Sequence, residues 1–281
     1  MTEVAWLGLG AMGSRMAARL RDSGPDLVVW NRTREKAEEL GAPVASSPRD
    51  AAERAAIVFT MLADPDALRA VTEGEDGALA GLADGAVLVE MSTVGPEAIA
   101  RLAERMPAHA SLLDVPVLGS LPEAETGRLK LFAGGDDAPF ERVRPLLATL
   151  GEPLRTGPLG SGAAAKLVAN ATLVGTIALL GETVALADAL DLPRETTWEV
   201  LGATPLAAQA DRRRPVIESR EYPPRFRLSL ARKDAELVVT AGEAGSLDLP
   251  ALEAAREHLA AAEHAGLGNE DYAAVLKHIL G

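Results

Sequence analysis

The stretch that decides the fold reads Val4-Ala5-Trp6-Leu7-Gly8-Leu9-Gly10-Ala11-Met12-Gly13, an apolar run that leads directly into three spaced glycines. In a strand-turn-helix unit the first glycine permits a tight turn, the second lets the backbone approach a pyrophosphate, and the third lets helix and strand pack closely. The positive end of the following helix attracts phosphate. We therefore expect the cofactor to contact Gly8, Leu9, Gly10, Ala11, Met12 and Gly13. The alternative is a glycine-rich turn that binds nothing.

Short apolar runs alternate with helical patterns through the rest of the first half. Strands are expected at 4–7, 27–30, 56–61, 87–90, 112–115 and 129–132. Helices are expected at 12–21, 34–40, 65–73 and 139–150. Apolar strands separated by helices are typical of βαβ units and of a sheet covered on both faces. We predict an α/β fold, in which residues 1–160 form a Rossmann-type, doubly wound and mostly parallel sheet.

The second half is predicted to be an all-helical domain, 161–281, because no convincing strand follows the loop 157–162. Its helices are expected at 163–190, 196–201, 232–244, 250–265 and 271–280. The first of these is rich in Ala, Leu and Glu and has no internal proline, which favours one long helix. A helix so long and apolar is expected to serve both domains or a subunit interface, so we predict a substrate and dimerisation domain and a homodimer.

Composition excludes several classes of function. The net charge of −13 argues against a nucleic-acid partner, and the absence of cysteine excludes disulfides, thiolate catalysis and zinc–thiolate sites. The four histidines have no metal-ligand spacing, so no metal is expected. The N-terminus lacks the basic and apolar pattern of a secretory signal, which predicts a cytoplasmic protein. The weakly polar stretch 167–181 is too short for a membrane span and predicts a buried helix, so no membrane partner is expected.

The end of the second strand indicates which dinucleotide is bound. Sites that prefer NAD place an acidic residue there for the ribose 2′-hydroxyl. This chain has Asn31, Arg32 and Thr33 instead, and its first carboxylate is Glu35, inside the next helix. A guanidinium with neighbouring amide and hydroxyl groups suits a 2′-phosphate. The sequence therefore predicts NADP(H) in preference to NAD(H), although Arg32 could instead be a solvated surface residue.

Other strand ends should contribute to the same crevice. Met61, Leu62 and Thr93 are expected to flank the ribose and nicotinamide, and Ser92 to face the substrate. A third strand end leads into Leu118, Gly119 and Ser120, where the N–H groups of Gly119 and Ser120 could hold a substrate carboxylate. Each of these could equally be an ordinary strand-to-loop turn.

Lys166 is the sharpest candidate for catalysis, with Asn170 four residues later on the same helix face. It follows the loop 157–162 at the expected domain junction, where substrate clefts commonly lie. Its neighbours are apolar, so it is either a lysine that extends to solvent or a functional cation. The pair Lys233-Asp234 poses the same choice between a site and an exposed ion pair. The basic run 212–214 is expected to be a solvated helix end.

Four ordered segments, spread nearly from end to end of the chain, resemble the β-hydroxyacid dehydrogenase family, which includes 3-hydroxyisobutyrate dehydrogenases and glyoxylate and succinic semialdehyde reductases. The segments are residues 8–17, similar to the family's cofactor signature; 114–120, similar to its substrate loop; 160–170, similar to its catalytic segment; and Lys233-Asp234. Residues 266–275 resemble the usual ending. The string 31–33 is similar to that of the NADPH-dependent glyoxylate and succinic semialdehyde reductase branch.

The resemblance implies roles for individual residues. Lys166 would be the general acid/base, Asn170 would orient the substrate, and Thr93 would lie near the nicotinamide. Phe226 and Asp234 would line the substrate pocket, and Lys233 would contact the cofactor. The implied activity is an NADPH-dependent oxidoreductase acting on a small aldehyde acid or 3-hydroxy acid. Imine reductases share the fold but usually lack the catalytic lysine.

One position departs from the family pattern. The substrate loop usually reads Pro-Val-Ser-Gly, and Leu118 stands here in place of the serine. A donor to the substrate carboxylate is missing unless Ser120 or backbone N–H groups substitute, which leaves room for a bulkier or less polar substrate. Two alternatives stay open: an NAD-linked 3-hydroxyisobutyrate-type dehydrogenase, and a non-catalytic NADP(H)-binding sensor or scaffold.

Overall fold

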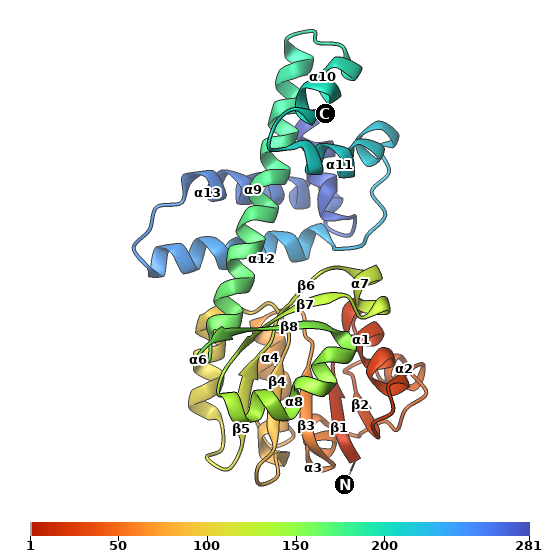
Figure 1. Cartoon of the computed structure of the whole chain (residues 1–281), viewed down its shortest axis with the longest axis vertical. Coiled ribbons are helices and arrows are strands. Elements are labelled where there is room, and N and C mark those ends of the chain that lie inside the picture. The colour runs from red at the N-terminus through yellow and green to blue at the C-terminus, as the bar shows by residue number, and fades with distance from the viewer. Residues whose placement is uncertain (1) are drawn as a thin grey trace. The chain divides into compact units, whose positions relative to one another are not determined.

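The computed structural model describes residues 2–281, which divide after Lys166 into two compact units. Unit 1 contains the sheet and its covering helices, and unit 2 is helical (Figure 1). The expected α/β fold followed by an all-helical domain is confirmed. The expected boundary at 160 lies in the loop before the long helix, whereas the division lies inside that helix. The reason is that Ala163, in its first turn, packs into the core of unit 1.

The sheet of unit 1 has eight strands in the order β2-β1-β3-β4-β5-β7-β6, and β8 pairs with β7. The strands are β1 (Thr2–Leu7), β2 (Leu27–Trp30), β3 (Ala55–Thr60), β4 (Val87–Glu90), β5 (Ser111–Asp114), β6 (Val117–Leu118), β7 (Leu129–Gly134) and β8 (Gly151–Gly157). β1 to β5 are parallel, whereas β7 runs antiparallel to β5 and β6. The carboxyl ends of the first five strands therefore meet at one edge, where ligands bind in such sheets.

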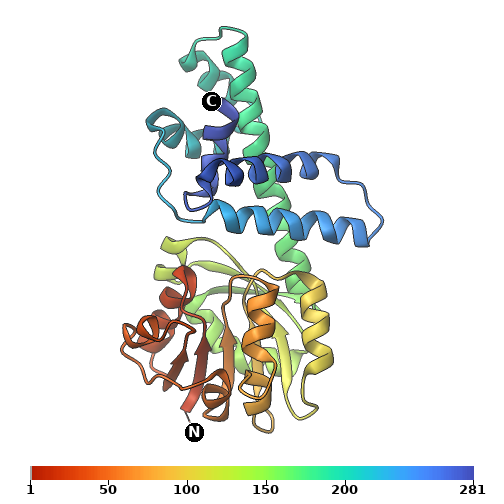
Figure 2. The same ribbon diagram turned by 180° about the vertical axis from the view of Figure 1, so that it is seen from behind.

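Helices cover both faces of this sheet (Figures 1 and 2). They are α1 (Ala11–Asp22), α2 (Arg34–Glu38), α3 (Pro48–Glu53), α4 (Pro65–Thr72), α5 (Ala78–Gly81), α6 (Gly95–Arg105), α7 (Leu121–Thr126) and α8 (Asp137–Leu150). Side chains alternate along each strand, so Trp6 and Phe59 pack with α1 and α8, whereas Ala5 and Val58 pack with α3, α4 and α6. Burial on both faces explains why the strands read as continuous apolar runs.

Unit 2 is built on the long helix α9 (Ser161–Ala189), whose first turns belong to unit 1. The other elements are α10 (Arg194–Gly202), α11 (Ala207–Ser219), α12 (Leu228–Ala244), α13 (Pro250–Ala262), a π-helical turn (Glu263–Leu267), a 3-10 turn (Tyr272–Ala274) and α14 (Val275–Leu280). Its core joins one side of α9, including Val174, Ile177 and Val184, to α12, α13 and the C-terminal segment.

Two strands and five helices were missed by the sequence patterns. β8 carries Pro153 and is half-exposed, so it lacks the apolar run that marks a buried strand. α11 contains Pro215 and three consecutive arginines, which hide its periodicity. The expectation of a solvated helix end at 212–214 is wrong for Arg213, whose side chain is buried inside unit 2. The reason is tertiary: a carboxylate and an aromatic ring from the C-terminal segment surround the guanidinium.

The expectation that α9 is a buried helix needs correction. The helix is long and apolar enough to cross a membrane by length and composition, and 44% of its most apolar window is buried. Val168, Leu179, Leu186 and Leu190 are between 51% and 70% exposed. At about 100° per residue Val168, Leu179 and Leu186 fall on one face of α9, and Leu190 follows directly after the helix. Unit 2 therefore covers one side of the helix and leaves a stripe of apolar side chains exposed on the other, interspersed with Thr172 and Glu182.

Candidate cofactor and substrate site

The glycine loop has the geometry that a dinucleotide needs. Gly8 has a φ of +100°, and a Cβ there would lie 2.3 Å from the carbonyl oxygen of Met61. A Cβ on Gly13 would lie 2.1 Å from the carbonyl oxygen of Gly8, so strand and helix approach too closely for any side chain. Gly10 borders open space within 4 Å, and the α1 N-terminus has no side-chain cap and no acidic residue in its first turn. The loop can therefore receive a pyrophosphate group.

Asn31 and Arg32 play different parts at the end of β2. The Asn31 Oδ1 atom accepts a hydrogen bond from Leu9 N at 2.9 Å, and its Nδ2 donates to Thr33 O at 2.8 Å. Asn31 therefore shapes the glycine loop. The Arg32 side chain is exposed and has no ion pair or hydrogen bond with the described residues. It is the cation left available for a ligand at this strand end, because neighbouring Arg34 pairs with Glu38 at 2.8 Å.

A buried carboxylate that the patterns missed organises the ends of β3 and β4. Glu90 has no exposed surface, and its carboxylate accepts hydrogen bonds from the Thr60 hydroxyl and from Ser92 N. The Ser92 hydroxyl in turn accepts from Leu62 N at 2.7 Å. Ser92, expected to face substrate, is thus buried and engaged in shaping the loop that carries Leu62. A glutamate ending the apolar run 87–90 was the signal that could have revealed this network.

The predicted substrate segment 114–120 contains the short strand β6 and ends just before α7. Leu118 is 38% exposed and Gly119 has a φ of +139°, a conformation that favours glycine. Ser120 N donates to Glu123 Oε2 at 2.8 Å, as in a helix capping box at the start of α7. In this structure the Ser120 N–H group is engaged within the chain, and its contact with a substrate carboxylate stays a prediction. An apolar side chain stands where the family pattern has a hydroxyl.

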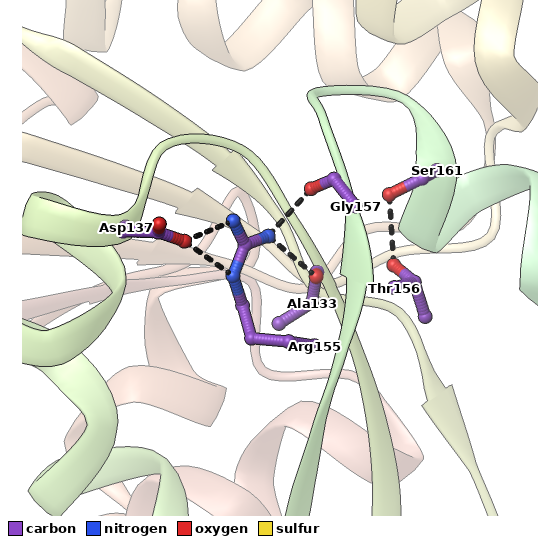
Figure 3. A network of polar contacts seen from close by, with 6 residues as sticks. All are labelled: Ala133, Asp137, Arg155, Thr156, Gly157 and Ser161. Atoms are coloured by element: carbon purple, nitrogen blue, oxygen red, sulfur yellow. Dashed lines mark hydrogen bonds and ion pairs between the residues drawn. The ribbon is translucent and has the colours of Figure 1, made fainter.

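The loop before α9 is held by polar contacts from the sheet (Figure 3). Arg155 on β8 donates to the carbonyl oxygens of Ala133 and Gly157 and pairs with Asp137. The Thr156 and Ser161 hydroxyls lie 2.9 Å apart, so β8 is linked directly to the first residue of α9. These contacts, together with Asp114 at the end of β5, place the beginning of the helix that carries Lys166.

The two catalytic candidates on α9 are both buried. Lys166 is 8% exposed and Asn170, one helical turn later, is 1% exposed. Asn170 Nδ2 donates to Asp234 Oδ2 at 2.8 Å, and Asp234 Oδ1 pairs with Lys233 Nζ at 2.8 Å. The Lys233 and Asp234 side chains are only 17% and 5% exposed, so they are not the exposed ion pair that was the alternative.

This arrangement leaves one acceptor unused. Asn170 Oδ1 is buried and has no hydrogen-bond partner within residues 2–281. A buried polar atom without a partner is costly, whereas the bond to Asp234 fixes which way the amide faces. The Asn170 oxygen is therefore available to a donor on a ligand.

Phe226 is held by a buried cluster at the C-terminal segment of unit 2. Asp271 Oδ2 accepts from Arg225 N and Phe226 N, each at 3.0 Å. The Phe226 ring lies 5.7 Å from that of Tyr272. Arg213 stands over the Tyr272 ring at 4.6 Å, donates to its hydroxyl, and lies 3.7 Å from Asp271 Oδ1. Burial raises the pKa of the Tyr272 phenol, which keeps it neutral.

Two known protein families match the chain, one over the sheet-containing unit 1 and one over the helical unit 2. Residues 3–169 match the family described as the NAD binding domain of 6-phosphogluconate dehydrogenase. Residues 160–279 match the family described as the NAD-binding domain of NADP-dependent 3-hydroxyisobutyrate dehydrogenase. Within residues 2–281 no group of three or more His, Asp or Glu side chains could hold a metal ion.

Similar proteins span the whole chain. Glyoxylate/succinic semialdehyde reductase 1 of Arabidopsis thaliana is 32% identical over 99% of this chain and 98% of its own length. 3-Sulfolactaldehyde reductase of Escherichia coli is 34% identical over 99% of this chain and 96% of its own length. The solved structure of Mycobacterium tuberculosis 3-hydroxyisobutyrate dehydrogenase with L-serine superposes with a TM-score of 0.86 at 24% identity, covering both chains completely, which shows the same fold.

A Rossmann domain with an open pyrophosphate loop, joined to a helical domain by a helix with a buried lysine, defines a nicotinamide-dependent oxidoreductase. The chain is more than 30% identical to two such reductases over nearly its whole length, which identifies the family within this class. The chain belongs to the β-hydroxyacid dehydrogenase family.

Proposed function

We propose that this protein is an NADPH-dependent reductase of small aldehyde acids such as glyoxylate or succinic semialdehyde. The observation that carries the proposal is the buried pair Lys166 and Asn170 on one face of α9, with Asn170 Oδ1 left without a partner. The similarity to the Arabidopsis glyoxylate/succinic semialdehyde reductase supports the substrate class. Bound NADPH supplies the hydride.

The residues of the chain supply the proton and the orientation. The Lys166 ammonium holds the proton that the substrate's carbonyl oxygen takes up as it becomes an alcohol. Asn170 Oδ1 can accept the hydrogen bond of that new hydroxyl, and Asp234 keeps the amide in this orientation. Because general acid catalysis requires a proton donor within hydrogen-bond reach, the fixed geometry of one helix turn suits the reaction.

The substrate proposal is tested with a panel of glyoxylate, succinic semialdehyde and 3-hydroxyisobutyrate, each assayed with both nicotinamide cofactors. We expect the aldehyde acids to be reduced faster with NADPH than with NADH. Faster oxidation of 3-hydroxyisobutyrate with NAD would instead identify an NAD-linked dehydrogenase. Retained NADPH binding without turnover of any compound would favour a sensor or scaffold.

Replacing Arg32 by alanine should raise the Kd of NADPH about tenfold, because a charge-assisted contact to the 2′-phosphate contributes about 1.5 kcal/mol or more. The Kd of NADH should change less than about twofold, since NADH has no such phosphate. Cofactor fluorescence titration measures both constants. Arg34→Ala is the matched control, because its side chain already pairs with Glu38. An equal rise in Kd for NADPH and NADH would show that Arg32 does not recognise the 2′-phosphate.

The exposed stripe formed by Val168, Leu179 and Leu186 of α9, with Leu190 directly after the helix, is proposed to pair with the same stripe of a second copy. A two-fold interface uses the same patch on both subunits, which a helix face with repeated exposed apolar side chains permits. The net charge of −13 disfavours an anionic lipid surface as the occupant.

Leu179→Glu and Leu186→Glu together should convert the dimer to a monomer in analytical ultracentrifugation. Val200→Glu is the matched control, because Val200 is equally exposed but lies on α10, outside the stripe. A wild-type protein that sediments as a monomer would contradict the dimer, and recovery only in detergent would point to a lipid partner.

A further inference from the structure

Asp114 joins the end of β5 to the beginning of α9. It is fully buried, and its two carboxylate oxygens accept from different places: Oδ1 from Gly160 N at 2.8 Å and Oδ2 from Ala163 N at 2.7 Å. Gly160 belongs to the loop before the helix and Ala163 to its first turn. The Asp114 side chain thus binds both the loop that precedes α9 and the first turn of the helix.

This carboxylate is costly to keep in place. It forms no ion pair with any Lys, Arg or His of the described chain, and burial raises its pKa more than the surrounding N–H groups lower it. Its compensation comes from backbone N–H groups at the positive end of α9. A neutral residue would avoid much of the desolvation cost, so what Asp114 contributes is the pair of oriented contacts.

The first turn of α9 also rests directly on strand backbones. A Cβ added at Gly162 would lie 2.2 Å from Phe132 O and 2.5 Å from Asp114 O, closer than any side chain allows. On the other side, the Thr156–Ser161 hydrogen bond ties the helix start to β8 (Figure 3). The helix start is therefore held from three strands at once.

Lys166 follows Ala163 by three residues, so it projects from the next turn on the same side of the helix. Asp114 also immediately precedes the segment 115–120, which contains β6 and carries the predicted substrate contacts. Any shift of the helix start relative to β5 would move Lys166 relative to that segment. A misplacement of about 1 Å can lower a reaction rate by about a hundredfold.

We propose that Asp114 is a positioning residue that sets the place of Lys166 by gripping the first turn of α9. The inference rests on the proposed function, in which Lys166 protonates the substrate. Asp114 itself touches neither substrate nor cofactor in this proposal; it acts through the helix.

The test begins with Asp114→Asn, which keeps the shape of the side chain and only one carbonyl acceptor. We expect kcat for aldehyde reduction to fall about thirtyfold, with the Kd of NADPH unchanged within about twofold. Asp84→Asn is the matched control: its side chain is 98% exposed and lies near His109, outside the contacts that hold the start of α9, and kcat should stay within about twofold. Unchanged kcat in Asp114→Asn would overturn the proposal.

A double-mutant cycle separates positioning from general damage. If Asp114 acts through Lys166, adding Asp114→Asn to a Lys166→Ala protein should lower the residual rate less than about twofold. A further thirtyfold loss in that background would overturn the proposal, because the effect would then be independent of the lysine. A failure of the proposed function can be told apart from these outcomes. In that case Lys166→Ala alone would keep the wild-type rate.

A milder variant covers the case in which Asp114→Asn does not fold, as judged by its thermal unfolding. Thr156→Val removes one hydrogen bond at the same helix start. It should lower kcat about threefold, because losing one hydrogen bond should shift the first turn of α9, and with it Lys166, less than losing the Asp114 contacts does. It should have no effect in the Lys166→Ala background. A folded Thr156→Val protein with the wild-type kcat would show that the contacts at the start of α9 do not position Lys166.

Discussion

Replacing Lys166 by alanine should lower kcat for aldehyde reduction about a thousandfold, because a positioned general acid contributes about 10² to 10⁴ in rate. The Kd of NADPH should stay within about twofold, since the glycine loop and Arg32 lie elsewhere in unit 1. Steady-state assays give the first quantity and cofactor fluorescence the second. Lys277→Ala, which removes a lysine paired with Glu270 at the surface, is the control and should keep full activity.

Lys166→Arg distinguishes proton donation from simple charge. Arginine keeps the positive charge but does not release its proton at the pH of the assay, so turnover should remain nearly as low as in the alanine variant. Recovery of a large part of the wild-type kcat with arginine would mean that Lys166 works as a fixed cation. Full activity in Lys166→Ala would show that another group donates the proton.

Replacing Arg213 by methionine should destabilise the protein by about 3 kcal/mol, because removing one partner leaves a buried carboxylate without its cation. Arg213 and Asp271 are 8% and 6% exposed, and the Tyr272 hydroxyl loses its partner as well. Urea unfolding followed by circular dichroism measures the change. KM for the aldehyde should also rise, since Asp271 holds the backbone of Phe226.

Arg214→Met is the matched control for this measurement. Arg214 is next in sequence but pairs with Glu195 and Glu218 at the surface, so its loss should be much smaller. Equal stability losses for the two variants would contradict the assignment of the buried role to Arg213.

The parts of the site that lie close together in sequence could be predicted. The glycine loop is a strand, a turn and a helix in succession, so its three glycines mark it without knowledge of the rest of the fold. Lys166 and Asn170 lie one turn apart on one helix, so helical spacing alone places them together. The NADP(H) preference and the substrate remain predictions, because both depend on contacts with molecules outside the chain.

What only the tertiary structure decided are contacts between distant segments. Glu90 gains its partners from β3 and from its own loop, and Asp114 grips a helix that begins far along the chain. Arg213 looked like a surface residue because two other arginines flank it, yet Asp271 and Tyr272 bury it. The exposed Val168, Leu179 and Leu186 of α9 are as apolar as the residues on the buried side of that helix. The periodicity of a sequence indicates which residues are buried. Which residues they pack against is determined only by the tertiary structure.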